Sequence, residues 1–322
     1  MHPSRILRRS LVMAALAVPL AAVAFPDKTI EWVVPYPAGG GSDVVARTLA
    51  EPMSKALGQN IIINNKPGAA TNIGADYASR AKADGHVVLT ADTATLAANP
   101  SLYSKLTYNV EKDFAPVGLM ARFPMLLVVN TSLPVKNLAE FTAWAKQQPG
   151  GVSYATPGAG SPHHLATELF RESSGLAFVH VPYRGAAPAV QDVIGGQVPF
   201  MFADTASAYP HIISGKLRAI GVASPKRLEG FDAVPTLQEQ GMKGFEAYAW
   251  QGLVVPAGTP AQTVMALNKA LLAALDTAAV KARFQTLGLE AIPSTPQKMD
   301  VYAKSEREKW GKVIRASNIR LD

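Results

Sequence analysis

The chain has 322 residues, of which 48% are hydrophobic and 17% are charged, so it can bury one or two sizeable cores and is not a disordered chain. It contains no cysteine, which excludes disulfides, thiolate chemistry and a lipid anchor on a cysteine. The formal net charge of +7 comes without a basic block interleaved with aromatic residues, and this excludes a nucleic-acid-binding protein.

Residues 1–24 have the pattern of a signal peptide. Three arginines precede an apolar run that ends in Ala22-Val23-Ala24, a small-x-small cleavage pattern. A membrane anchor is the alternative, but the run is short for a membrane span and contains Pro19. We predict cleavage after Ala24 and a periplasmic mature protein. Both the general and the twin-arginine export routes remain open.

A glycine-rich turn follows the first predicted strand, at residues 30–34. This first glycine loop is Tyr36-Pro37-Ala38-Gly39-Gly40-Gly41-Ser42-Asp43, and a helix is predicted after it over residues 44–57. Ser42 and Asp43 are residue types that cap a helix start. Glycines let a ligand approach the backbone, and a helix start offers unpaired N–H groups and a positive dipole end. The turn therefore suits an anion, although it lacks the lysine of a phosphate loop and the third glycine of a dinucleotide fingerprint.

The chain then alternates between strands and helices. Strands are predicted at residues 60–65 and 87–90, with a helix over residues 71–83 between them. The stretch Ala91-Asp92-Thr93 follows the third strand. This alternation predicts a mostly parallel sheet with helices on its faces, and ligands of such sheets bind beyond the carboxyl ends of the strands. The first glycine loop and Ala91-Asp92-Thr93 both fall at that edge.

A second α/β unit begins with an apolar strand at residues 125–129 and contains a second glycine loop. That loop, Thr156-Pro157-Gly158-Ala159-Gly160-Ser161, leads into a helix that starts at Pro162 and runs to about residue 173. Ser161 is placed to cap this helix, and proline is favoured at a first helical position. Further strands are predicted at 152–155, 178–181, 198–202, 217–223 and 253–255, and further helices at 137–147, 188–194, 260–275, 278–287 and 297–317.

Short motifs along residues 26–318 resemble a known family, the extracytoplasmic solute receptors of tripartite tricarboxylate transporters, often called Bug-type receptors. The resemblance rests on Ile30-Glu31-Trp32-Val33-Val34-Pro35, Asn65-Lys66-Pro67-Gly68-Ala69, Lys112-Asp113-Phe114-Ala115-Pro116-Val117, Gly158-Ala159-Gly160-Ser161, His180-Val181-Pro182-Tyr183-Arg184-Gly185, Trp250-Gln251-Gly252-Leu253 and Pro256-Ala257-Gly258-Thr259-Pro260.

The resemblance implies a type II periplasmic binding protein, an α/β flytrap of two lobes with a mostly parallel sheet in each. Residues 25–124 plus 249–322 would form lobe 1, and residues 125–248 would form lobe 2. The implied ligand is a small mono-, di- or tricarboxylate or an acidic amino acid, held between the glycine loops by backbone N–H groups, hydroxyls and waters. The implied partners are the membrane subunits of a tripartite tricarboxylate transporter, and the receptor is expected to be a monomer without cofactors.

Two strand ends depart from the family pattern. The family often has a Gly-Thr pair after the third strand, where this chain has Ala91-Asp92-Thr93, and Ala203-Asp204-Thr205 follows a strand end that varies between members. Asp43 and Asp204 could cap helices instead of facing the ligand. The predicted ligand contacts are Tyr36, Pro37, Gly39, Gly40, Ser42, Asp43, Ala91, Asp92, Thr93, Thr156, Gly158, Gly160, Ser161, His164 and Asp204.

Three polar side chains near the second loop have competing interpretations. We expect His164 to brace the loop as a neutral donor, His163 to be exposed, and Arg184 to be a surface charge and not a carboxylate clamp. Ser161 and His164 could belong to a hydrolase, but no G-x-S-x-G motif is present, and no metal-ligand spacing accompanies the histidines. We therefore predict neither catalysis nor a metal site. A binding protein that signals to a membrane sensor without transport is the remaining alternative.

Overall fold

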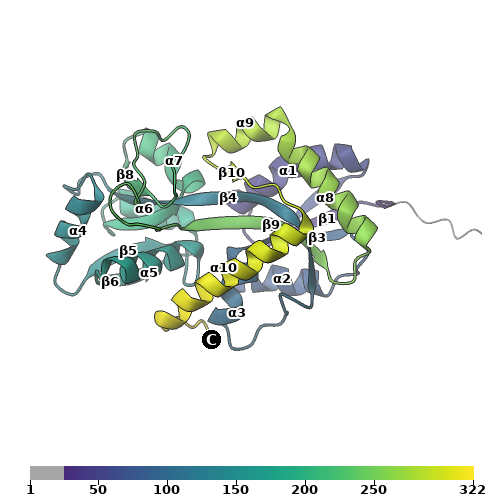
Figure 1. The fold of residues 1–322 in the computed structure, drawn as a ribbon, viewed down its shortest axis with the longest axis horizontal. Coiled ribbons are helices and arrows are strands. Elements are labelled where there is room, and N and C mark those ends of the chain that lie inside the picture. Colours follow the sequence, from purple (N-terminus) through teal and green to yellow (C-terminus); the bar gives the residue numbers. More distant parts are fainter. Residues whose placement is uncertain (1–24) are drawn as a thin grey trace, which may run out of the picture.

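A computed structural model describes residues 25–322 (Figure 1), so the predicted signal peptide lies outside the described residues. The strands are β1 (Ile30–Val34), β2 (Ile61–Asn65), β3 (Val87–Asp92), β4 (Phe114–Asn130), β5 (Val152–Thr156), β6 (Phe178–Pro182), β7 (Phe200–Asp204), β8 (Leu217–Val222), β9 (Tyr248–Pro256) and β10 (Glu290–Ala291). The α-helices are α1 (Gly41–Leu57), α2 (Asn72–Ser79), α3 (Asn99–Leu102), α4 (Leu138–Lys146), α5 (Pro162–Ser174), α6 (Ala186–Ile194), α7 (Thr205–Ile213), α8 (Ala261–Asp276), α9 (Ala278–Thr286) and α10 (Pro296–Ala316). A 3₁₀ turn (Ala69–Thr71) precedes α2, and a π-helix (Thr93–Ala98) follows β3.

The strands form two groups that share β4. In the first group, β1 pairs in parallel with β2 and β3, whereas β9 pairs antiparallel with both β3 and β4. In the second group, β5 pairs in parallel with β6 and β7, whereas β4 pairs antiparallel with β7 and β8. Each sheet is therefore mixed, and the expectation of mostly parallel sheets needs this correction. The reason is that β4 and β9 run against their neighbours where the chain passes between the two groups.

The strand β4 is much longer than the sequence predicted. Its second half, from Met125 on, is the apolar run expected to be a strand, whereas its first half contains Pro116, Gly118 and Pro124, which disfavour strand predictions. Irregularities in the register with β9 accommodate these residues. Where the two groups meet, the Met125 N–H donates to the Ala247 carbonyl oxygen over 3.1 Å.

Helices cover both faces of each group of strands. On one face of the first group, α1 and α8 bury Trp32, Leu49 and Leu271, and on the other face α10 buries Trp310. Figure 1 shows α10 running along one side of the molecule from the first group of strands to α5, and α10 packs against both β4 and α5. The second group is packed on one face around Phe200 and on the other around side chains of α6. The large cores expected from the composition are thus present.

Several boundaries differ from the sequence-based expectation. The helix expected over residues 71–83 ends at Ser79, and β3 extends through Asp92, so Ala91 and Asp92 belong to the strand. The π-helix, α3, α7 and β10 were not predicted. The other predicted helices agree within about three residues at each end, which is the usual uncertainty of helix boundaries.

Candidate ligand-binding site

The first glycine loop connects β1 to α1 at the carboxyl edge of the first group of strands. The helix begins at Gly41, its N-cap is Gly40, and no side chain caps it. Ser42 and Asp43 therefore lie inside the first turn, and neither side chain caps the helix. Gly39 has φ of +82°, a left-handed conformation that favours glycine, and Pro37, Gly39 and Gly40 are exposed.

The carboxylate of Asp43 holds this loop in place through hydrogen bonds. One carboxylate oxygen accepts hydrogen bonds from the Gly39 N–H (2.8 Å) and from Nε of Arg47 (2.9 Å), and the other accepts one from the Asn65 amide (2.9 Å). Burial alone would raise the pKa of Asp43, but these hydrogen bonds outweigh burial and hold the pKa below its usual value. Asp43 is only 2% exposed, and its carboxylate holds the loop in shape.

Asp92 connects the loop to the end of β3. Its carboxylate accepts hydrogen bonds from the backbone N–H and the hydroxyl of Thr95, over 2.9 and 2.8 Å, and from the hydroxyl of Tyr36. Burial raises the pKa of Asp92, and these hydrogen bonds reverse only part of that shift. Ala91 is buried in the core, and the buried Thr93 hydroxyl accepts a hydrogen bond from the Trp250 N–H (2.9 Å). All three predicted contacts at this strand end thus have their side chains buried.

The second glycine loop connects β5 to α5. Ser161 caps α5 as predicted, because its Oγ accepts a hydrogen bond from the His164 N–H over 3.3 Å. The Thr156 hydroxyl accepts one from the Gly158 N–H, also over 3.3 Å. Gly160 has φ of +73°, and a Cβ there would lie 2.7 Å from Cδ1 of Leu102 and 2.8 Å from Cδ1 of Leu321. The loop therefore packs closely against Leu102 of α3 and Leu321 of the carboxyl-terminal segment.

His164 braces the second loop as an acceptor, not as the donor we expected. Its Nδ1 accepts the Gly160 N–H over 3.0 Å, and its ring stacks on His180 with centroids 3.9 Å apart. Burial and the neighbouring His180 lower the pKa of His164 to about 4, so the ring is neutral at physiological pH, as predicted. Because Nδ1 accepts, the ring proton of the neutral form is on Nε2.

His163, expected to be exposed, is buried, so that expectation is wrong. Its Nε2 lies 3.0 Å from Oδ2 of Asp204, and the residue is only 8% exposed. Asp204 caps α7 by accepting hydrogen bonds from the N–H (2.9 Å) and the hydroxyl (2.8 Å) of Ser207. Burial would raise the pKa of Asp204, but His163 and Ser207 outweigh it and lower that pKa. The helix-capping interpretation of Asp204 therefore describes its geometry.

Gln251 is a buried polar residue that the sequence analysis did not single out. It lies in β9 and is 4% exposed, and its Nε2 donates to the Ser42 hydroxyl over 2.6 Å. Its Oε1 has no hydrogen-bond partner within the described chain. Gln251 belongs to the motif Trp250-Gln251-Gly252-Leu253, but the motif does not indicate a role for its amide, and only the fold brings that amide to the first glycine loop.

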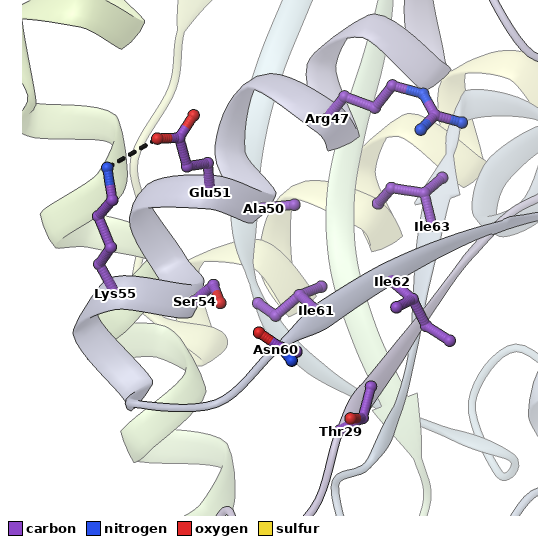
Figure 2. Close-up of a pocket in the computed structure, with 10 residues that line it drawn as sticks. All are labelled: Thr29, Arg47, Ala50, Glu51, Ser54, Lys55, Asn60, Ile61, Ile62 and Ile63. Atoms are coloured by element: carbon purple, nitrogen blue, oxygen red, sulfur yellow. Dashed lines mark hydrogen bonds and ion pairs between the residues drawn. The ribbon is translucent and has the colours of Figure 1, made fainter.

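A surface hollow of about 650 Å³ lies elsewhere, between α1 and the edge strand β2 (Figure 2). Its lining includes Arg47, Ile61 and Ile63, and the ion pair of Lys55 with Glu51 (2.7 Å) spans successive turns of α1 beside it. None of the predicted ligand contacts lines this hollow. It is therefore separate from the two glycine loops.

The described residues lack the geometry of several other kinds of site. The ring of His164 faces Gly160 and makes no hydrogen bond with the Ser161 hydroxyl in the described structure, so these residues form no nucleophile–base pair. Between residues 25 and 322, no three His, Asp or Glu side chains are grouped so that they could hold a metal ion. No single helix in this range has the length and apolar character of a membrane span; α8 and α9 meet these criteria only as a pair bent by 67°.

The chain is similar to known proteins over most of its length. Residues 45–319 match the family model described as "Tripartite tricarboxylate transporter family receptor". The protein BugT of Bordetella pertussis is 35% identical over 312 residues, which cover 97% of this chain and 96% of BugT.

Two similar proteins have been solved with a small carboxylate. A protein of R. palustris with adipate is 32% identical, with a TM-score of 0.86 over 92% of this chain and 99% of that one. MatC from Rhodopseudomonas palustris with bound malate is 34% identical, with a TM-score of 0.82 over 90% of this chain and all (100%) of that one. The predicted binding-protein fold class is confirmed by this likeness.

Proposed function

Because the chain belongs to the tripartite tricarboxylate transporter receptor family, whose members are binding receptors and not enzymes, we propose that it captures a small carboxylate in the periplasm and delivers it to the membrane subunits of such a transporter. The observation that carries the proposal is the pair of glycine loops at the starts of α1 and α5, one in each group of strands. Two relatives of the same fold were solved with dicarboxylates, adipate and malate.

The start of α1 suits a carboxylate particularly well. Gly40 provides no capping side chain, so the first N–H groups of this 17-residue helix remain available to an anion. A hydrogen bond to a charged group contributes about 1.5–3 kcal/mol net. Three or four such bonds would support micromolar affinity, about −8 kcal/mol, after the loss to ordering. Asp43 and His164 hold the two loops in shape for this role.

The two groups of strands would act as the two lobes of a flytrap. We place lobe 1 at residues 25–124 plus 249–322 and lobe 2 at residues 125–248, because the chain passes between the groups near Met125 and Ala247. A ligand that contacts loops of both lobes binds the closed form better and shifts the population toward it. No second copy is needed for this motion, so the receptor would act as a monomer.

A thermal-shift screen of the mature protein tests the carboxylate function. A ligand at 100 times its Kd stabilises the folded state by about 2.7 kcal/mol, so the Tm should rise clearly with at least one of malate, succinate, adipate, citrate and aspartate. Neutral sugars and simple cations serve as controls and should give no shift. If sugars or cations raised the Tm while every carboxylate left it unchanged, the proposed function would be wrong.

Export of the mature protein is part of the same proposal. Residues 1–24 carry the signal-peptide pattern, and cleavage after Ala24 would leave Phe25 as the first residue. The intact mass of protein recovered from the periplasm should equal that of residues 25–322. A mass that still includes Met1 would contradict the cleavage.

A further inference from the structure

The amide of Gln251 is buried beside the first glycine loop with one polar atom unpaired. Its Nε2 donates to the Ser42 hydroxyl over 2.6 Å, whereas its Oε1 is buried and has no partner among residues 25–322. Native structures rarely leave a buried acceptor unpaired, because the loss of its hydrogen bonds to water is not compensated. The free oxygen therefore points to a missing partner.

The place of Gln251 in the fold indicates what that partner is. In the sheet, Gln251 lies opposite Asp92, the last residue of β3, and on its other side opposite Ala121 of β4. Ligands of such sheets bind beyond the carboxyl ends of the parallel strands, where β3 ends. Its hydrogen bond to Ser42 places the amide at the first turn of α1, the helix start that suits a carboxylate. Gln251 thus lies between the end of β3 and the start of α1.

The unpaired Oε1 of Gln251 determines which kind of ligand group can bind to it. A carbonyl oxygen only accepts hydrogen bonds, and so does a carboxylate, so Oε1 cannot bind the carboxylate itself. It can bind a hydroxyl or an ammonium group that the ligand carries close to that carboxylate. The opposite orientation of the amide would instead leave a free NH₂ group, which would donate to the carboxylate of every ligand equally.

We propose that Gln251 contacts the ligand, that its Oε1 accepts a hydrogen bond from a hydroxyl or ammonium group near the ligand carboxylate, and that the receptor therefore prefers hydroxy- or amino-carboxylates to unsubstituted ones. This inference rests on the carboxylate-binding function proposed above. It adds a specificity-determining side chain to the proposed site.

Calorimetric titration with malate, aspartate and succinate tests the inference, because these four-carbon dicarboxylates differ only in a hydroxyl, an ammonium group or neither. The wild type should bind malate or aspartate about tenfold more tightly than succinate, since one net hydrogen bond contributes about 0.5–1.5 kcal/mol and 1.4 kcal/mol is a factor of ten. Gln251→Met keeps the size of the side chain. This variant should lose the preference, so that it binds malate, aspartate and succinate about equally tightly. The exposed Gln262 of α8 gives a matched control, and Gln262→Met should leave the preference unchanged.

The outcomes separate this inference from the proposed function. If succinate binds as tightly as malate and aspartate to the wild type, the inference is overturned while carboxylate binding stands; this comparison needs no variant to fold. If Gln251→Met, with an unchanged Tm, keeps the wild-type preference, the preference has another origin and the inference fails. A loss of affinity for all three ligands by the same factor would show a free NH₂ group instead. If no carboxylate binds at all, the proposed function itself is refuted.

Discussion

Gly160→Leu is expected to lower the free energy of unfolding by about 2–5 kcal/mol before any ligand is added. A Cβ at Gly160 would lie within 2.8 Å of the Cδ1 atoms of both Leu102 and Leu321, so both of these side chains would have to shift. Overpacking of this kind costs about 1–3 kcal/mol. The left-handed φ of +73° adds about 1–2 kcal/mol for a residue with a Cβ. Urea unfolding of the free protein measures the loss.

Gly175 provides the matched control for this substitution. It ends α5 with a similar φ of +66°, but nothing lies within 4 Å of a Cβ built there. Gly175→Leu should therefore pay only the conformational cost of about 1–2 kcal/mol. Equal losses for the two variants would show that Leu102 and Leu321 do not confine the loop.

Acid is expected to weaken the fold through His164 well above the pH at which most carboxylates are protonated. The pKa of His164 is about 4 in the folded protein and 6.5 without the fold, so between these values the unfolded state binds more protons. Stability therefore rises with pH across this window and falls as pH is lowered from 6.5 to about 4. The difference amounts to a loss on the order of 3 kcal/mol. The lowered pKa of His180 acts in the same direction.

His164→Asn separates this titration from the structural role of the ring. An asparagine amide oxygen can accept the Gly160 N–H in place of Nδ1, but the amide does not titrate. Urea unfolding at several pH values between 4 and 7 should show a clearly smaller pH dependence for the variant than for the wild type. An unchanged pH dependence would mean that another group carries the proton uptake.

The local features of the site could be read from the sequence, whereas its long-range pairs could not. The cap of Ser161, the helix after it and both glycine loops depend on residues within a few positions of one another, and these predictions agree with the structure. The hydrogen bond between Gln251 and Ser42 joins residues 209 positions apart, and no local pattern marks it.

The surroundings of two neighbouring histidines could not be read from the sequence. His163 and His164 are adjacent in one helix, so they point in directions about 100° apart. Only the fold decides that the first meets Asp204, 41 positions away, and that the second meets Gly160. The same limit applies to Asp43, whose type suggested a cap and whose partners Arg47 and Asn65 made it a brace. Which predicted contacts touch the ligand stays a prediction.

The pairing of β3 with β9 has a consequence for how the chain folds. One edge of β3 is completed by residues 251–254, so the first group of strands cannot close until that late segment is available. During synthesis one edge of β3 therefore stays unpaired until β9 has been made. The pairing of β3 with β9 then carries a large loop-closure entropy cost. Folding dominated by such distant pairings is slow, and it keeps the nascent chain extended and exposed for longer than a chain of local hairpins would be.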